Sequence, residues 1–174
     1  KVFEELKSND EKAINNYHCD SNILMEMAGA SIAQVIKEIA YGNESFYKSY
    51  VDGFLPKVPK KKTIQIIAGQ ADNGGDGLVI ARLLQDDFNV ITVLPFPPKS
   101  KMCSLQKERL ELLGIKTQDC MEDSCDILID SLFGTGFKGE VRAEFLPILK
   151  KMNEIKGVLA GLGLAGLISW LGIS

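Results

Sequence analysis

The pattern of apolar and polar positions predicts two helices at the start of the chain. Ser8, the first residue of a capping-box pattern, indicates a polar helix over residues 9–18. Ser21 or Asn22 is expected to cap a second helix over residues 23–40. Apolar residues of this second helix cover more than one face, which is typical of a helix buried on most sides, in part by another subunit.

From residue 63 onwards, apolar runs typical of buried strands alternate with helical patterns. Strands are predicted over 63–69, 89–96, 125–136 and 157–164. Helices are predicted over 75–87, 101–114 and 143–155, with Pro147 inside the last helix or close to its first turn, and a weaker helix candidate covers 44–55. Short connections between alternating strands and helices favour a parallel sheet covered on both faces, so the expected fold class is α/β.

Composition narrows the class of protein. The 174 residues have the length of one ordinary domain, and 45% hydrophobic and 25% charged residues are typical of a soluble globular protein. A net charge of −3 gives no electrostatic footprint for nucleic acid, and the basic run 56–62 is interpreted as a solvated loop. The uncharged stretch 157–174 barely reaches the length of a membrane span, so a buried strand with a packed tail is preferred to a membrane association.

The cysteines contain no CxxC pair, and the single histidine, His18, is expected on the surface. Reduced thiols in a cytoplasmic protein are therefore predicted at Cys19, Cys103, Cys120 and Cys125.

The loop "AGQADNGGDGL" after the first predicted strand is rich in glycine but carries two aspartates and no lysine. It matches neither the P-loop nor the dinucleotide fingerprint. Amides after Gly74 and Gly75 can accept an anion, whereas Asp76 is better suited to hydroxyl groups, a bound cation or proton transfer. In the alternative interpretation, Asp72 or Asn73 merely caps the following helix.

A second loop, "DSLFGTGFKGEVR", follows another buried strand. Asp130 ends that strand, and a desolvated carboxylate needs a partner. If the two strands adjoin, Asn73 and Asp130 can share a cation through hard oxygen atoms. Lys138 or Arg142 is expected either to meet phosphate charge or to be a solvated loop residue.

Together, "NGGDGLVIARLL", "DILIDSLFGTGFKGEVR" and the upstream "LMEMAGASIAQVI" resemble the YjeF N-terminal domain family, the NAD(P)HX epimerases. The resemblance covers roughly residues 22–160. It implies a Rossmann-like three-layer α/β/α sandwich with a mostly parallel sheet, usually a homodimer. Such a single domain would span 1–174, with N-terminal helices in 1–45, an α/β core in 63–160 and an atypical apolar tail in 157–174.

The family interconverts the R and S epimers of hydrated NADH and NADPH, NADHX and NADPHX, for a partner NAD(P)HX dehydratase. By position, the resemblance implies potassium ligands at Asn73 and Asp130. Asp76 is the predicted catalytic acid and base, in a mechanism that reversibly removes the hydroxyl group. The implied substrate-binding residues are Asp72, Asn73, Gly74, Gly75 and Asp76 in the first loop, and Gly134, Thr135, Gly136, Phe137, Lys138, Gly139 and Glu140 in the second.

The tail departs from the family pattern. Leu162 stands where the family has a substrate-binding Asp, and Ala165 stands where it has a potassium-binding Ser. Either the reported tail is frame-shifted or the site lacks two ligands. The second alternative favours a non-catalytic dimerising module, because the same domain resembles part of certain mRNA-decapping scaffolds and a lipoprotein-binding homologue.

Overall fold

The computed structural model describes residues 2–41, 61–134 and 140–161 of the chain. Its helices are α1 (Val2–Tyr17), α2 (Ser21–Tyr41), α4 (Asp72–Leu84), α5 (Lys101–Leu112) and α6 (Leu146–Glu154), and a short 3-10 helix, η1 (Ala143–Phe145), precedes α6. Its strands are β1 (Thr63–Ala68), β2 (Asn89–Val93), β3 (Thr117–Gln118), β4 (Ser124–Ser131) and β5 (Lys156–Gly161).

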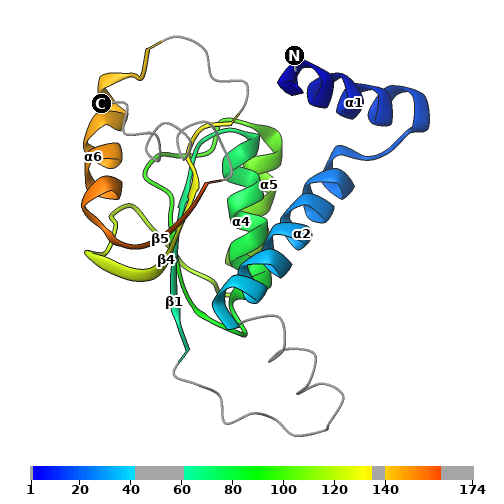
Figure 1. Ribbon diagram of the computed structural model, residues 1–174. Helices are drawn as coiled ribbons and strands as arrows, with labels where there is room; N and C mark the ends of the chain where they lie inside the picture. The colour runs from blue at the N-terminus through cyan, green and yellow to red at the C-terminus, as the bar shows by residue number, and fades with distance from the viewer. Residues whose placement is uncertain (1, 42–60, 135–139, 162–174) are drawn as a thin grey trace, which may run out of the picture.

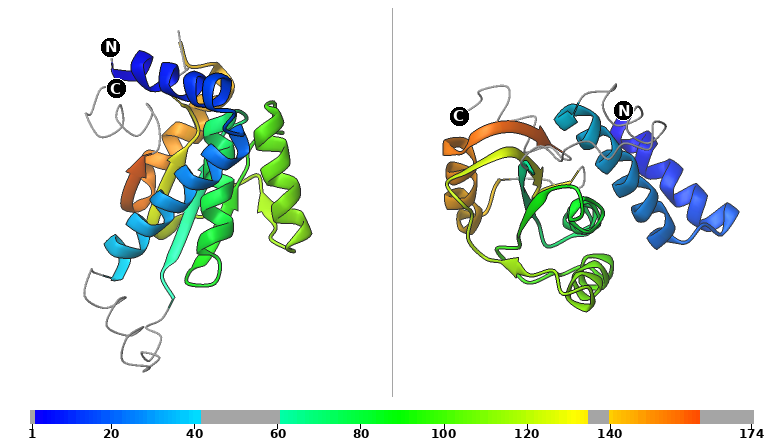
Figure 2. Two further views of the ribbon diagram at one scale, coloured as in Figure 1. Left: turned by 90° about the vertical axis from the view of Figure 1, so that its right-hand side faces the viewer. Right: turned by 90° about the horizontal axis from the view of Figure 1, so that it is seen from below.

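The strands of the described residues form one sheet in the order β3-β2-β1-β4-β5, and every neighbouring pair is parallel. Helices α2, α4 and α5 lie on one side of this sheet and α6 lies on the other (Figure 1). The turned views in Figure 2 show the same three layers. The predicted α/β class, a three-layer sandwich around a parallel sheet, is therefore confirmed.

Apolar side chains fill both faces of the sheet. The cluster on the α4 face includes Ile64 and Ile66 of β1, whereas the cluster on the α6 face includes Ile67 of β1 and Leu128 of β4. Successive residues of a strand point to opposite faces, so a strand covered on both sides needs a continuous apolar run. The strand "TIQIIA" meets this requirement except at Gln65, which is fully buried and exchanges two hydrogen bonds with the Glu122 backbone.

The predicted start of the first helix is wrong. α1 begins at Val2, so Ser8 lies inside the helix instead of capping it. Residues 2–7 contain no Gly or Pro, and nothing in them interrupts a helix. The cap of α2 is also shifted by one residue from the prediction, because the Asp20 carboxylate accepts a hydrogen bond of 2.7 Å from the Asn22 amide.

The other predicted elements are confirmed with shifted boundaries, and Pro147 occupies the first turn of α6. The strand β3 was not predicted, because two residues carry no readable periodicity. The helix candidate over 44–55 and the tail beyond Gly161 lie outside the described residues.

Helix α2 buries one face against its own chain and leaves another exposed. Met25, Ala33, Ile36 and Ala40 are buried, so within the single chain α2 is covered on one face, and the predicted cover by another subunit stays a prediction. The side chains of Ile23, Met27, Val35 and Ile39 are between 50% and 63% exposed. No helix in the described ranges is both long enough and apolar enough to cross a membrane.

Candidate functional site

Two loops meet at the carboxyl edge of the sheet, where β1 and β4 lie side by side. Ile67 pairs with Asp130, and Ala68 pairs with Ser131, which confirms that the two strands adjoin. The chain runs from β1 outwards to β2 and β3 and then returns to β4 on the other side of β1. Parallel α/β sheets bind ligands where the strand order reverses in this way.

The first loop leads directly into α4. The N-cap residue is Ala71, which has no side-chain oxygen, so the interpretation of Asp72 or Asn73 as a helix cap is wrong. Asp72 is the exposed first residue of the helix, and Asp76 is half-buried on its second turn. Because no N-cap side chain accepts from the first-turn amides, this end of α4 suits an anionic or hydroxyl-bearing ligand.

Gly74 and Gly75 are buried, and the first of them packs against backbone. A methyl group added at Gly74 would lie 1.9 Å from the Gly69 carbonyl oxygen. At Gly75 the added methyl would lie 2.9 Å from the end of the Met25 side chain. Glycine at position 74 therefore lets the helix start fold back onto the loop that precedes it.

Asn73 connects the two loops. Its side-chain nitrogen donates a hydrogen bond of 3.2 Å to the Phe133 carbonyl oxygen, just beyond β4. Gly134 lies against the same side chain, since a methyl group added there would be 3.1 Å from the Asn73 Cβ. The start of the second loop is thus held against the start of α4, as expected for a shared binding site.

Asp130 is a buried carboxylate, only 1% exposed. In the part of the chain that the structure describes, its hydrogen-bond donor is the Leu132 amide, at 3.0 Å from Oδ1, and it forms no ion pair. Burial raises the pKa of this carboxyl group above its usual value, and the single amide bond opposes that shift. A cation nearby would compensate the buried charge.

The far end of the second loop is also fixed to the first. The Arg142 guanidinium donates to the Gln70 side-chain oxygen at 3.2 Å and lies 4.8 Å from the centroid of the Phe145 ring. Arg142 also pairs with Glu144 at 3.0 Å, while its side chain stays 55% exposed, so these contacts are made at the solvent-facing surface. Glu140 is exposed. The predicted site residues Thr135, Gly136, Phe137, Lys138 and Gly139 lie outside the described residues.

Two residues near the site were not predicted from the sequence. Gln70 contacts Arg142 and also donates to the Pro97 carbonyl oxygen at 3.3 Å. Met25 of α2 supports Gly75 from behind. For Gln70 the available signal was its position directly after a strand at the reversal point; for Met25 no local pattern distinguishes it from other core residues.

The donor set can be tested against the potassium ion that the resemblance implied. Asp130 supplies a buried carboxylate without a basic partner among the described residues, and Asn73 offers an amide oxygen while its nitrogen donates to the Phe133 carbonyl oxygen. Hard oxygen atoms of this kind fit an alkali cation. No group of three or more His, Cys, Asp or Glu side chains is arranged for a metal within the described ranges. The carboxylate and amide oxygens of Asp130 and Asn73 are the hard donors that suit an alkali cation better than a transition metal.

Comparisons with known proteins agree with this geometry. The chain is 32% identical over 159 residues to the NAD(P)H-hydrate epimerase of Aedes aegypti, covering 87% of this chain and 63% of that protein. It is 33% identical over 160 residues to the NAD(P)H-hydrate epimerase of Anopheles darlingi, covering 88% and 63%. A bifunctional NAD(P)H-hydrate repair enzyme of Helicobacter pylori is 30% identical, covering 80% of this chain and 28% of that protein. The chain thus spans less than two thirds of each relative.

The fold has a solved counterpart. The crystal structure of yeast ynu0 superimposes with a TM-score of 0.69, covering 90% of this chain and 67% of that one, at 21% identity. This likeness supports the fold alone. A family model described as YjeF-related protein N-terminus matches residues 21–161, which include β1, α4, β4 and both ends of the second loop. The chain therefore belongs to the YjeF-related protein N-terminus family.

Proposed function

We propose that this chain is an NAD(P)H-hydrate epimerase, which interconverts the R and S epimers of hydrated NADH and NADPH. The observation that carries the proposal is the double anchoring of the second loop on the first, through Gly134 against Asn73 and Arg142 on Gln70. These contacts build one site over the reversal point of the sheet. The relatives named NAD(P)H-hydrate epimerase, which match most of this chain, support the same assignment.

The reaction needs a group that gives and then takes back one proton. Protonation of the substrate hydroxyl lets the carbon–oxygen bond break, and water leaves with the bonding electrons. The adjacent ring nitrogen stabilises the cation through its lone pair. Water then adds to the other face of the ring and returns its proton to the carboxylate. Asp76 is the proposed acid and base, because it is half-buried at the start of α4, beside the point where the two loops meet.

Asn73 and Asp130 are the proposed potassium ligands. A bound potassium ion would supply positive charge that offsets the Asp130 carboxylate and substrate phosphates, without strong Lewis acidity. The chain's own part is to place those oxygen atoms: Asp130 accepts from the Leu132 amide and Asn73 donates to the Phe133 carbonyl, so both side chains also hold the turn that begins the second loop.

The proposed partners are a second copy of the chain and an NAD(P)H-hydrate dehydratase. Ile23, Met27, Val35 and Ile39 recur every four residues or multiples of four, forming an exposed apolar stripe on α2. The same stripe on another copy can pack against it around a two-fold axis. Met27→Glu is expected to give monomers in sedimentation experiments, whereas Lys12→Glu on α1 should leave the dimer intact.

The activity is tested by following the two epimers of hydrated NADH by chromatography. The protein should speed their equilibration, and Asp76→Asn should lower the rate by about 10²-fold to 10⁴-fold. Asp86→Asn, a matched change beyond the other end of α4, should leave the rate unchanged. If the native protein gives only the spontaneous rate, the non-catalytic dimerising module, suggested by Leu162 and Ala165, becomes the better description.

A further inference from the structure

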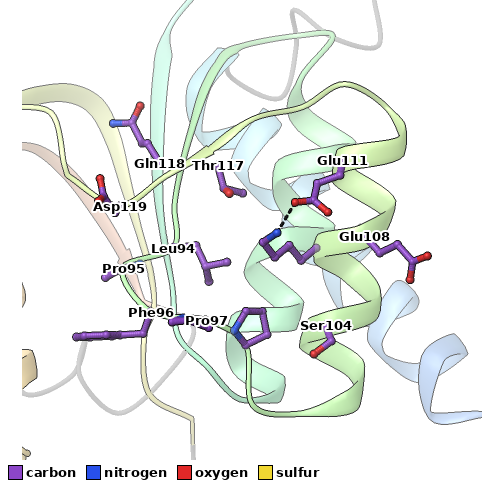
Figure 3. Close-up of a pocket in the computed structure, with 12 residues that line it drawn as sticks. Leu94, Pro95, Phe96, Pro97, Ser104, Glu108, Glu111, Thr117, Gln118 and Asp119 are labelled. Carbon is purple, nitrogen blue, oxygen red and sulfur yellow. Dashed lines mark hydrogen bonds and ion pairs between the residues drawn. The ribbon is translucent and has the colours of Figure 1, made fainter.

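A groove of about 760 Å³ opens next to the proposed site, at the carboxyl ends of β2 and β3. The segment 94–98 forms its floor. Gln118 and Asp119 stand on one side, and α5 forms the other side with Ser104 and Glu111 (Figure 3). Its lining is both apolar and polar, which suits a ligand with a flat base and a hydroxyl-bearing sugar.

The groove is joined to the first loop by hydrogen bonds from a single residue. The Gln70 side chain donates to the Pro97 carbonyl oxygen at 3.3 Å, on the groove floor. The Gln70 carbonyl oxygen accepts from the amides of Lys99 and Ser100, at 2.7 and 3.1 Å. Gln70 therefore holds the first loop against the segment that forms the groove floor.

In this strand order, the two halves of a bound dinucleotide would lie on opposite sides of β1. The strands β4 and β5 lie on one side, with Asp130, and the strands β2 and β3 lie on the other, with the groove. A dinucleotide whose phosphates lie at the start of α4 extends in both directions from the reversal point. If the reacting ring lies near Asp76 and Asp130, as the proposed function requires, the adenosine half extends towards β2.

The charges of the groove discriminate between two forms of that adenosine half. Lys107 is paired with Glu111 on α5, so its positive charge is already balanced. Asp119 contributes another carboxylate across the groove, and Glu108 of α5 also belongs to its lining. Carboxylates accept hydrogen bonds from ribose hydroxyl groups but repel a phosphate group on the ribose.

We propose that this groove holds the adenosine ribose of the hydrated dinucleotide, and that Glu111 and Asp119 make the chain prefer hydrated NADH to hydrated NADPH. This assignment rests on the proposed function for the identity of the substrate. It adds specificity-determining residues that lie outside the two loops.

The preference is measured by calorimetry with ADP-ribose and its 2′-phosphorylated form, which lack the reacting ring. ADP-ribose should bind about tenfold more tightly, and the ratio should fall as salt screens the carboxylates. Glu111→Gln, which removes one charge and frees Lys107, should bring the ratio close to one. Lys107→Gln should raise the ratio by about threefold. Asp86→Asn, beyond the end of α4 and not part of the groove lining, is the matched control and should leave the ratio unchanged.

Two results would overturn the assignment. One is equal binding of both ligands with no response to Glu111→Gln, and the other is no binding of ADP-ribose at all. A parallel epimerisation assay with hydrated NADH keeps the two proposals separate, because it reports the activity whichever way the binding ratio falls. Normal activity with equal binding of the two ligands would remove the groove assignment alone, and absent activity with the expected ratio would remove the epimerase assignment alone.

Discussion

Two neighbouring polar residues of β4, Asp130 and Ser131, lie on opposite faces of the sheet and differ in charge and in hydrogen bonding. Ser131 shares the α4 face, where its hydroxyl donates to the Ile67 carbonyl oxygen at 3.0 Å, so it is neutral and has a partner. Asp130, one residue earlier, shares the α6 face with Leu128 and Leu132. It is just as buried, yet it carries a carboxylate that accepts one amide bond.

The packing around these two residues differs as well. The α4 face is filled by aliphatic side chains of β1, α4, α2 and α5. On the α6 face, Phe145 meets the rings of Phe96 and Phe133 edge to face, each with a centroid distance of 4.9 Å. Arg142 lies over the Phe145 ring. The α4 face thus packs mainly through aliphatic side chains, whereas the α6 face carries the aromatic cluster that supports Phe133 and Arg142 of the second loop.

The largest expected effect is a test of the tight packing at the start of α4. Gly74→Ala should lower the free energy of unfolding by about 3 kcal/mol or more, because the new methyl group meets the Gly69 backbone, which cannot move aside. Gly75→Ala is the matched control and should cost less, since the Met25 side chain can shift. Thermal melting of both variants measures the difference, and equal costs would show that the close backbone contact is not limiting.

A pair of large-to-small changes separates the roles of the two faces. Phe145→Ala on the α6 face and Leu84→Ala on the α4 face should each cost about 3 kcal/mol, since both side chains are buried. Only Phe145→Ala should also weaken binding of ADP-ribose at a temperature where both variants are folded, because it removes support from Phe133 and Arg142. An equal loss of ADP-ribose binding in both variants would contradict the specific role of the α6 face in supporting the second loop.

The neighbouring polar residues of β4 should respond in opposite directions. In potassium-free buffer at neutral pH, Asp130→Asn should stabilise the protein by about 1 to 2 kcal/mol, because it removes a buried charge and keeps an acceptor for the Leu132 amide. Ser131→Ala should destabilise it by about 1 kcal/mol through the lost hydrogen bond.

The response of the melting temperature to potassium should also differ between the Asp130 and Ser131 variants. Replacing sodium by potassium should raise the melting temperature of the native protein and of Ser131→Ala, but not that of Asp130→Asn. A potassium response that survives in Asp130→Asn would remove Asp130 from the proposed cation site. This readout is independent of epimerase activity.

The smallest expected effect concerns Cys103, a free cysteine behind the first loop on the α4 face. Burial, with a smaller contribution from Asp72, raises the pKa of its thiol from 9.0 to about 11. The unfolded chain then loses this proton at lower pH than the folded chain, so stability should fall as the pH rises from 9.0 to about 11. Urea titrations of Cys103→Ala should show a shallower fall over that interval, and identical slopes would contradict the burial of a neutral thiol.

Much of the fold follows from local patterns, and the errors have physical causes. The apolar runs of β1, β2 and β4 identify buried parallel strands because both faces of each are covered. The capping-box pattern at Ser8 was misleading because a residue that can cap a helix does so only where the chain before it is not helical. β3 escaped prediction because two residues form a strand only when β2 offers them an edge.

The candidate site was predictable in its parts but not in its connections. Asn73, Asp76 and Asp130 are visible from residue type and from their positions after buried runs. Gln70 also follows a buried run, but its role could not be predicted, because its partners Arg142 and Pro97 lie 72 and 27 residues away in the sequence. A side chain's partners across such separations are set by strand order, and strand order is not written in any single segment.

The sequence by itself determined the alternation of strands and helices, the burial of β1 and β4 and the residue types at the carboxyl edge of the sheet, because these depend on local hydrophobicity and chain geometry. The tertiary structure decided on which face of the sheet each residue of β4 lies. It also decided that both ends of the second loop contact the first loop. Those outcomes depend on the parallel pairing of β1 with β4. A shift of that register by one residue would exchange the places of Asp130 and Ser131.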